Sequence, residues 1–196
     1  FIPVNEPLLD GNERAYLAEC IDTGWISSEG PFVTRFEEGM ARLTGRAHGI
    51  AVTNGSEALE LAVEILGIGP GDEVIIPAFT IISCAGPIVR RGAIPVVVDA
   101  DPRTWTMDVC ALEMLVTPRT RAIVPVHFGG APADLDALRD IAGPGRAIVE
   151  DAAHAFPPRI RGQMVGSIGD ATCFSFYANK TITTGEGGML ATNDER

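Results

Sequence analysis

Lys180 is the residue of this sequence that most directly offers chemistry. It is the only lysine among 196 residues, and it lies in residues 175–188, among small, hydroxylated and glycine residues rather than on a charged helical face. Burial disfavours the ammonium form of lysine, so in a confined pocket the neutral amine becomes a nucleophile that can form a Schiff base with an aldehyde cofactor. A lysine on a surface loop is the alternative, and this segment alone does not decide between them.

A carboxylate upstream favours the first interpretation. Residues 147–154 form an apolar run that ends in acidic residues, which is how a buried strand delivers an acid to the edge of a sheet. Asp151 precedes Lys180 by about one supersecondary unit. A lysine for the aldehyde carbon and a carboxylate for the pyridine nitrogen are the two groups that pyridoxal phosphate (PLP) requires.

A candidate anion site lies at the strand-to-helix turn of residues 53–57. Gly55 allows the backbone to approach a ligand, and the amides of Ser56 and Glu57 open a helix whose N-terminus favours an anion by about 0.3–1 kcal/mol. The Ser56 hydroxyl adds a donor for a phosphate, although a plain serine N-cap is the alternative. Because the chain has neither a Walker motif nor a Gly-x-Gly-x-x-Gly motif, the sequence does not support a P-loop ATPase or a nicotinamide dehydrogenase.

Two further side chains are candidates for contacts with a flat ring. Phe79 follows an apolar strand-like run and could cover one face of the ring, with a place in the core as the alternative. His154 follows Asp151 by three positions and could hydrogen-bond a phenolate oxygen. We expect His48 and His127 to have structural roles, and a structural role is also the alternative for His154.

Composition limits the classes of partner. The 15 basic and 26 acidic residues give a net charge of −11, which repels a polyanion, so nucleic acid is not an expected partner. No apolar run approaches the roughly 20 residues of a membrane span. The first residues have neither the basic region nor the apolar core of a secretory signal. The four widely spaced cysteines indicate free thiols in a reducing cytosol and no zinc site. The missing initiator methionine and an end directly after a strand-like run lead us to expect a fragment.

The chain as a whole predicts an α/β fold. Two amphipathic helices, with stripes that include Tyr16, Leu17, Phe36 and Met40, are expected to pack together before any sheet begins. Strands then alternate with helices, which implies right-handed crossovers and a mostly parallel sheet with helices on both faces, in one domain over residues 1–196. The expected strands are 48–52, 73–76, 94–98, 122–126, 147–149, 172–176 and 189–191, and the expected helices are 56–66, 80–91 with an interruption at Pro87, 108–116 and 134–142.

Three stretches agree with one family. Residues 53–59 (TNGSEAL), 150–155 (EDAAHA) and 175–188 (SFYANKTITTGEGG) resemble the sugar aminotransferases of the DegT/StrS family, which have the aspartate aminotransferase fold, PLP-dependent fold type I. The resemblance covers essentially the whole chain, which would correspond to the large, PLP-binding domain. Residues 24–28 and 179–188 are most similar to the perosamine synthases of that family, which aminate a GDP-linked 4-keto-6-deoxy sugar.

The resemblance implies a role for each candidate residue. Lys180 would carry the cofactor, Asp151 would bind the pyridine nitrogen, and His154 would take a position near the ring oxygen where relatives often have glutamine. Relatives often place an aromatic residue at the position of Ile81, so here the cover of the ring would be aliphatic. The phosphate would be held by Gly55, Ser56, Glu57 and Ser175.

The function implied by the resemblance is transfer of an amino group from an amino acid, glutamate, to a nucleotide-linked keto sugar such as GDP-4-keto-6-deoxymannose. The family also implies a homodimer with shared active sites and a smaller C-terminal domain that this chain lacks. Two alternatives stay open: a sugar dehydratase of the same family, in which histidine replaces the lysine, and a non-catalytic binding or regulatory protein on this scaffold. Candidate cations for the sugar's diphosphate are Arg90, Arg91, Arg159 and Arg161.

Overall fold

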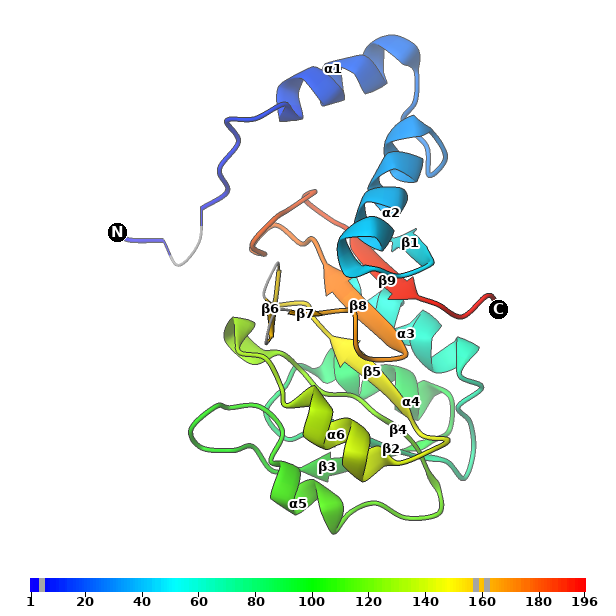
Figure 1. Ribbon diagram of the computed structural model, residues 1–196. Coiled ribbons are helices and arrows are strands. Elements are labelled where there is room, and N and C mark those ends of the chain that lie inside the picture. The colour runs from blue at the N-terminus through cyan, green and yellow to red at the C-terminus, as the bar shows by residue number, and fades with distance from the viewer. Residues whose placement is uncertain (4–5, 157–158, 161–162) are drawn as a thin grey trace.

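A mixed seven-stranded sheet forms the centre of the molecule (Figure 1). The computed structural model describes residues 1–3, 6–156, 159–160 and 163–196. The strand order is β1-β9-β8-β5-β4-β2-β3, in which β1–β9 and β9–β8 are antiparallel and the other pairs are parallel. The expected mostly parallel sheet is therefore confirmed. Its strands are β1 (His48–Val52), β2 (Glu73–Pro77), β3 (Ile94–Val98), β4 (Thr120–Ile123), β5 (Ala147–Asp151), β8 (Ala171–Ser175) and β9 (Gly188–Thr192).

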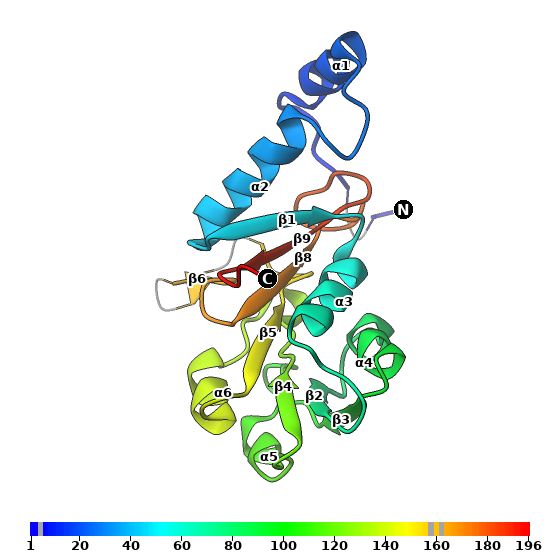
Figure 2. The same ribbon diagram turned by 90° about the vertical axis from the view of Figure 1, so that its right-hand side faces the viewer.

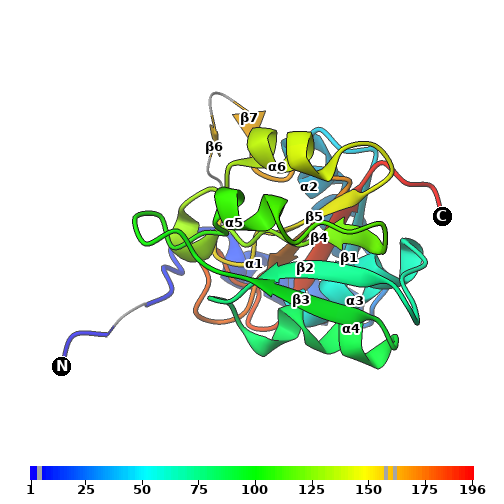
Figure 3. The ribbon, with the colours of Figure 1, turned by 90° about the horizontal axis from the view of Figure 1, so that it is seen from below.

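Helices cover both faces of the sheet, as Figures 2 and 3 show. On one face α3 (Gly55–Ile65) and α4 (Gly86–Arg90) pack on a buried cluster that contains Val74 and Ile76 of β2. On the other face α5 (Val109–Glu113) and α6 (Leu135–Ala142) pack on a cluster that contains Ile75. Successive side chains of β2 thus pack in clusters on opposite faces of the sheet, as the two-residue period of a strand requires. This explains why the strand is apolar throughout.

The two N-terminal helices differ in how much of their surface they bury. The second, α2 (Pro31–Thr44), buries Met40 against β8 and β9. The first, α1 (Glu13–Thr23), has no buried residue, and Leu17 and Ile21 are 65% and 74% exposed. Figure 1 shows α1 projecting from the end of the molecule, away from the sheet. The expectation of two packed helices was therefore wrong for the first, which touches the second chiefly through the rings of Tyr16 and Phe32, 5.2 Å apart.

Three local features also depart from the sequence-based elements. The helix expected over 80–91 is a 3₁₀ turn, η1 (Ile82–Cys84), followed by the short α4. Pro87 lies in the first turn of α4, where its missing N–H costs nothing, so it marks a helix start rather than an interruption. A second 3₁₀ turn, η2 (Phe128–Gly130), follows β4, and a hairpin of β6 (Arg159–Ile160) and β7 (Gln163–Met164) follows β5.

Candidate active site

A cavity of about 250 Å³ lies where β1, β5 and β8 end. Asn54 follows β1, Asp151 is the last residue of β5, and Ser175 is the last residue of β8. In open α/β sheets this edge is the usual position of a ligand site. The cavity is lined by Asn54, Gly55, Ser56, Leu59, Ile81, Ser83, Asp151, Ala153, Ser175, Tyr177 and Lys180.

Asp151 is held rigidly at the floor of this cavity. Its side chain is buried, at 2% exposure. One carboxylate oxygen, Oδ1, accepts the Ala153 amide at 2.9 Å, and the other, Oδ2, accepts the Cys84 thiol at 3.2 Å. Its main chain continues the sheet pattern, since the Asp151 amide donates to the carbonyl of Pro125 at 2.8 Å and its carbonyl accepts the amide of His127 at 3.0 Å. The structure therefore fixes this carboxylate before any ligand binds.

Lys180 and His154 share the electrostatic environment of Asp151. Burial lowers the pKa of Lys180 below its ordinary value, and attraction by the Asp151 carboxylate opposes that shift. Burial also lowers the pKa of His154, the positive charge of Lys180 lowers it further, and Asp151 opposes both. A lowered pKa makes more of the Lys180 amine neutral and nucleophilic at a given pH.

The N-terminus of α3 forms one side of the cavity. Asn54 is the N-cap, and its Oδ1 accepts the Glu57 amide at 3.0 Å. The Ser56 hydroxyl lies 2.7 Å from that of Ser83. Gly55 packs so closely on β8 that a Cβ atom added there would lie 2.9 Å from Cβ of Ser175. The hydroxyls of Ser56 and Ser83 thus lie together at the N-terminus of α3, and Ser175 lines the same cavity.

The two candidates for covering a ring occupy different places. Ile81 lines the main cavity, and also a small adjoining crevice with Phe128 and His154. The Phe79 ring packs against Phe128 at 4.3 Å and against Trp105 at 5.0 Å between centroids, beside the cavity rather than in its lining. The structure therefore offers Ile81 as the cover, and Phe79 supports Phe128, whose ring edge packs on His154 at 5.5 Å.

Glu150, the neighbour of Asp151, points to the other face of the sheet, where it binds His127 and backbone amides of the segment before β8. Its carboxylate accepts Nε2 of His127 at 3.1 Å and the Gly166 amide at 3.0 Å, and it also accepts the Gly169 amide. His127 Nδ1 accepts the Ala133 amide at 3.1 Å, so the proton of the neutral ring lies on Nε2. Burial alone would raise the pKa of Glu150, but its hydrogen bonds to His127 and to the Gly169 and Gly166 amides outweigh burial, and the pKa lies below its ordinary value.

Sequence reasoning placed most of the polar lining but missed part of it. Lys180, Asp151, Gly55, Ser56 and Ser175 all line the cavity. Glu57 is exposed and is not among the residues that line the cavity, and its amide donates to Oδ1 of Asn54. The prediction did not include Asn54, Ser83, Tyr177 or Cys84. Only Asn54 carried a recognisable signal, because asparagine before a helix is a preferred N-cap.

A phosphate-bearing pyridine aldehyde fits the donors and acceptors of this cavity. A buried carboxylate suits a protonated ring nitrogen, and a lysine with a lowered pKa suits the aldehyde carbon. A helix N-terminus with two hydroxyls suits the phosphate. Among the described residues, no group of histidine, cysteine, aspartate or glutamate side chains has the arrangement of a metal site.

Two of the four candidate arginines have partners on α3. Arg90 forms an ion pair with Glu60, and Arg91 lies 3.6 Å from Glu64, both on α3. Arg161 lies outside the described residues, and the side chain of Arg159 is not described. Arg90 and Arg91 are therefore paired with acidic residues of α3 and are not among the residues that line the cavity.

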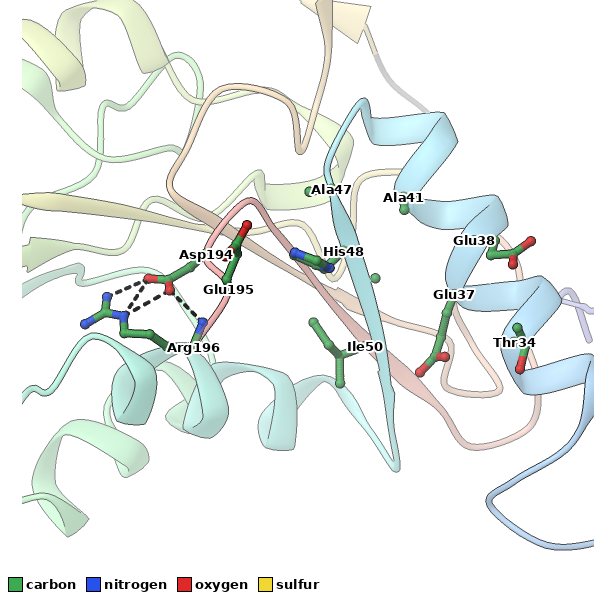
Figure 4. A pocket seen from close by; sticks show the side chains of 11 residues that line it. Thr34, Glu37, Glu38, Ala41, Ala47, His48, Ile50, Asp194, Glu195 and Arg196 are labelled. Carbon is green, nitrogen blue, oxygen red and sulfur yellow. Dashed lines mark hydrogen bonds and ion pairs between the residues drawn. The ribbon is translucent and has the colours of Figure 1, made fainter.

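A larger hollow of about 430 Å³ lies elsewhere, at the start of β1 (Figure 4). It is lined by Glu37 and Glu38 of α2, by His48, and by residues 194–196, in which Arg196 binds Asp194. His48 begins β1 and Asn54 follows its end, so this hollow lies at the opposite end of the strand from the candidate site. Its acidic lining is unsuited to a phosphate.

Comparison with known proteins identifies the family. The family model described as DegT/DnrJ/EryC1/StrS aminotransferase family matches residues 7–196. The chain belongs to this family. Among curated relatives, it is 52% identical to the GDP-perosamine synthase of Caulobacter vibrioides, over 99% of this chain and 53% of that protein. It is 48% identical to the spore coat polysaccharide biosynthesis protein SpsC of Bacillus subtilis, over 100% of this chain and 50% of that protein.

Solved structures of family members share the fold. The PLP form of a sugar aminotransferase from Streptococcus pneumoniae superposes with a TM-score of 0.92 at 34% identity, over 99% of this chain and 53% of that one. A variant of GDP-4-keto-6-deoxymannose-3-dehydratase with bound GDP-perosamine gives a TM-score of 0.95 at 27% identity, over 100% and 52%. The PLP-dependent fold type I expected from the sequence is therefore confirmed. The chain spans about half the length of the relatives that it matches.

Proposed function

We propose that the protein is a PLP-dependent aminotransferase that moves an amino group from glutamate to a nucleotide-linked keto sugar. The observation that carries the proposal is one cavity that holds Lys180, Asp151 and the serine-bearing N-terminus of α3. Identity of 52% and 44% to GDP-perosamine synthases supports GDP-4-keto-6-deoxymannose as the acceptor. Cytoplasmic location and a homodimer with shared active sites are parts of the same proposal.

The proposed division of labour follows from the positions of the side chains. PLP, when bound, supplies a ring that withdraws electrons from the carbon losing its proton. The Asp151 carboxylate would accept the hydrogen bond of the protonated ring nitrogen, a charge-assisted contact worth about 1.5–3 kcal/mol. Ser56 and Ser175, with the first amides of α3, would bind the phosphate and so hold the cofactor in the cavity that Asp151 also lines.

Lys180 acts as the anchor for the aldehyde carbon and as the proton carrier. Its lowered pKa leaves a larger share of neutral amine to take a proton from the amino-acid carbon. The nearby carboxylate of Asp151 stabilises the ammonium form that results, which allows the same group to return the proton. His154 lies in the adjoining crevice with Asp151 and Ile81 and provides a ring nitrogen for the cofactor's phenolate oxygen.

A sugar dehydratase of this family is the second candidate function. The fold of the GDP-sugar dehydratase structure supports it, since the TM-score is 0.95. Residue 180 is lysine rather than the histidine that the resemblance assigns to dehydratases, and this favours amino transfer. A non-catalytic binding protein on the same scaffold would not need the buried carboxylate and the lysine together.

The decisive test incubates the full-length protein with glutamate and a panel of GDP-, UDP- and dTDP-linked keto sugars. We expect an amino sugar from the GDP-linked 4-keto-6-deoxy sugar, with nitrogen at C4. Product from only a UDP- or dTDP-sugar would refute the GDP assignment and keep amino transfer. A deoxygenated sugar without nitrogen would establish the dehydratase, and a protein without cofactor absorbance or turnover would establish the binding protein.

A further inference from the structure

Cys84 contacts the carboxylate that the proposed function assigns to the cofactor. It is the last residue of η1, at 2% exposure, and its sulfur lies 3.2 Å from Oδ2 of Asp151. On its other side the Thr80 hydroxyl lies 3.0 Å from the same sulfur. The three polar atoms form a short chain between β2 and the end of β5.

The direction of these two hydrogen bonds follows from their chemistry. An ionised carboxylate can only accept, so the thiol donates to Oδ2. The sulfur then accepts from the Thr80 hydroxyl, which is the remaining donor of the pair. Burial and the charge of Asp151 raise the pKa of Cys84 far above its ordinary value, so the thiol keeps the proton that it donates.

We propose that Cys84 is a positioning residue that fixes the plane of the Asp151 carboxylate toward the cavity. The thiol restrains Oδ2 from the α4 side while the Ala153 amide restrains Oδ1 from the loop after β5. A carboxylate has about four acceptor positions, so two fixed donors orient the group and leave positions for a ring N–H. The role in cofactor binding rests on the proposed function, whereas the hydrogen bond itself does not.

Packing is the alternative explanation for a buried cysteine, and Cys173 provides the control. It lies on β8 directly beside Asp151 in the strand register, at 1% exposure, in the same buried cluster as Cys84. No hydrogen bond joins its thiol to Asp151 in the part of the chain that the structure describes. Changing Cys173 to alanine removes the same atoms from the same core and leaves the contacts of the carboxylate in place.

The first measurement is the infrared S–H stretch of the full-length protein without cofactor. The Cys84 band, assigned by its loss in Cys84→Ala, should lie at lower frequency than the Cys173 band, because donation to a carboxylate weakens the S–H bond. In Asp151→Asn it should move toward the Cys173 band, since an amide is a weaker acceptor. A Cys84 band at the free-thiol position, or one unmoved in Asp151→Asn, would overturn the hydrogen bond.

The second measurement is the dissociation constant of PLP, from its visible absorbance, in the cysteine variants. We expect Cys84→Ala to bind about fivefold more weakly, the equivalent of about 1 kcal/mol. Cys84→Ser should recover most of that loss because it keeps a donor, and Cys173→Ala should bind like wild type. Equal losses in the two alanine variants, or no rescue by serine, would reduce Cys84 to packing.

The two measurements separate this proposal from the proposed function. If wild type binds no PLP, the proposed function and the positioning role both fail, while the S–H band still decides the hydrogen bond. If Cys84→Ala does not fold, the comparison of wild type with Asp151→Asn decides the hydrogen bond, and Cys84→Ser tests the donor by matching the wild-type dissociation constant.

Discussion

Lys180, Asp151 and His154 form one coupled electrostatic unit at the end of β5. Each of Lys180 and His154 has a pKa lowered by burial, and Asp151 opposes both shifts. The positive charge of Lys180 also lowers the pKa of His154. The carboxylate therefore partly offsets the effect of burial on the pKa of both neighbours, and a change at Asp151 should alter the pKa of Lys180 without a change to the lysine itself.

The effect of Asp151 on the pKa of Lys180 can be measured directly. In the cofactor-free protein, the Lys180 amine should titrate below the usual lysine value of about 10.4, because burial disfavours its charged form. In Asp151→Asn the opposing attraction is gone, so the Lys180 pKa should fall further. The measurement is an NMR titration of the methylated lysine signal, assigned by its loss in Lys180→Arg. An unchanged or higher Lys180 pKa in Asp151→Asn would contradict the coupling.

At the scale of elements, the approach of α3 to β8 builds the anion site. The N-terminus of α3 can reach Ser175 only because residue 55 has no Cβ. Gly55→Ala should therefore push α3 from β8, lower the free energy of unfolding by about 1–3 kcal/mol and weaken cofactor binding.

A matched control for Gly55 lies in α2. A Cβ at Gly39 would meet nothing within 4 Å, so Gly39→Ala should stabilise the helix by about 0.5–1 kcal/mol and leave cofactor binding unchanged. Urea denaturation and a PLP titration of both variants make the comparison. Similar behaviour of the two alanines would mean that the contact of α3 with β8 is looser than the structure indicates.

The segment 166–169 depends on Glu150, whose carboxylate accepts three of its amides, those of Gly166, Ile168 and Gly169, and also binds His127. Because the pKa of Glu150 is below its usual value of about 4.3, its stabilising contribution is complete above that pH and is lost as the pH falls through the folded-state pKa. Glu150→Gln should lower the free energy of unfolding at pH 7 by about 1–3 kcal/mol, and the difference from wild type should shrink in acid.

Urea denaturation at neutral and acidic pH tests this prediction. Glu64→Gln is the control, since the Glu64 side chain is 59% exposed and its loss should cost less than about 0.5 kcal/mol. A Glu150→Gln deficit that stays constant as the pH falls would show that the stabilisation does not come from the ionised carboxylate.

Sequence patterns predicted the sheet better than the details of the site. The apolar runs of β2 and β5, with turns after them, identify buried strands, and Asp151 at a strand end follows from the same pattern. The contact of Cys84 with Asp151 joins residues 67 positions apart, and no local period encodes it. The exposed stripe of α1 was misjudged because an amphipathic pattern predicts an apolar face without identifying what covers it.

For the whole molecule, α1 and the loop after it leave apolar side chains in solvent. Leu17, Ile21 and Ile26 are 65%, 74% and 83% exposed, and exposed apolar side chains that gather into a patch mark interaction sites. These exposed side chains support the proposal of a homodimer with shared active sites.

The corresponding prediction compares residues 1–196 alone with the full-length protein. The shorter chain should bind PLP more weakly and show little amino transfer, because contacts proposed to come from a second subunit and from the rest of a longer chain are missing. A PLP titration and a glutamate-dependent turnover assay on both proteins measure the difference. Equal affinity and equal turnover would mean that the cavity at the ends of β1, β5 and β8 is self-contained.

Borohydride reduction of the full-length protein tests most directly the proposed bond between Lys180 and the cofactor. The protein purified with PLP should show a visible absorbance band that reduction removes, and mass spectrometry of the digested protein should place the added mass on the peptide that contains Lys180. Lys180→Arg should take up no such mass. An adduct on a different residue, or a reduced protein without an adduct, would contradict the account.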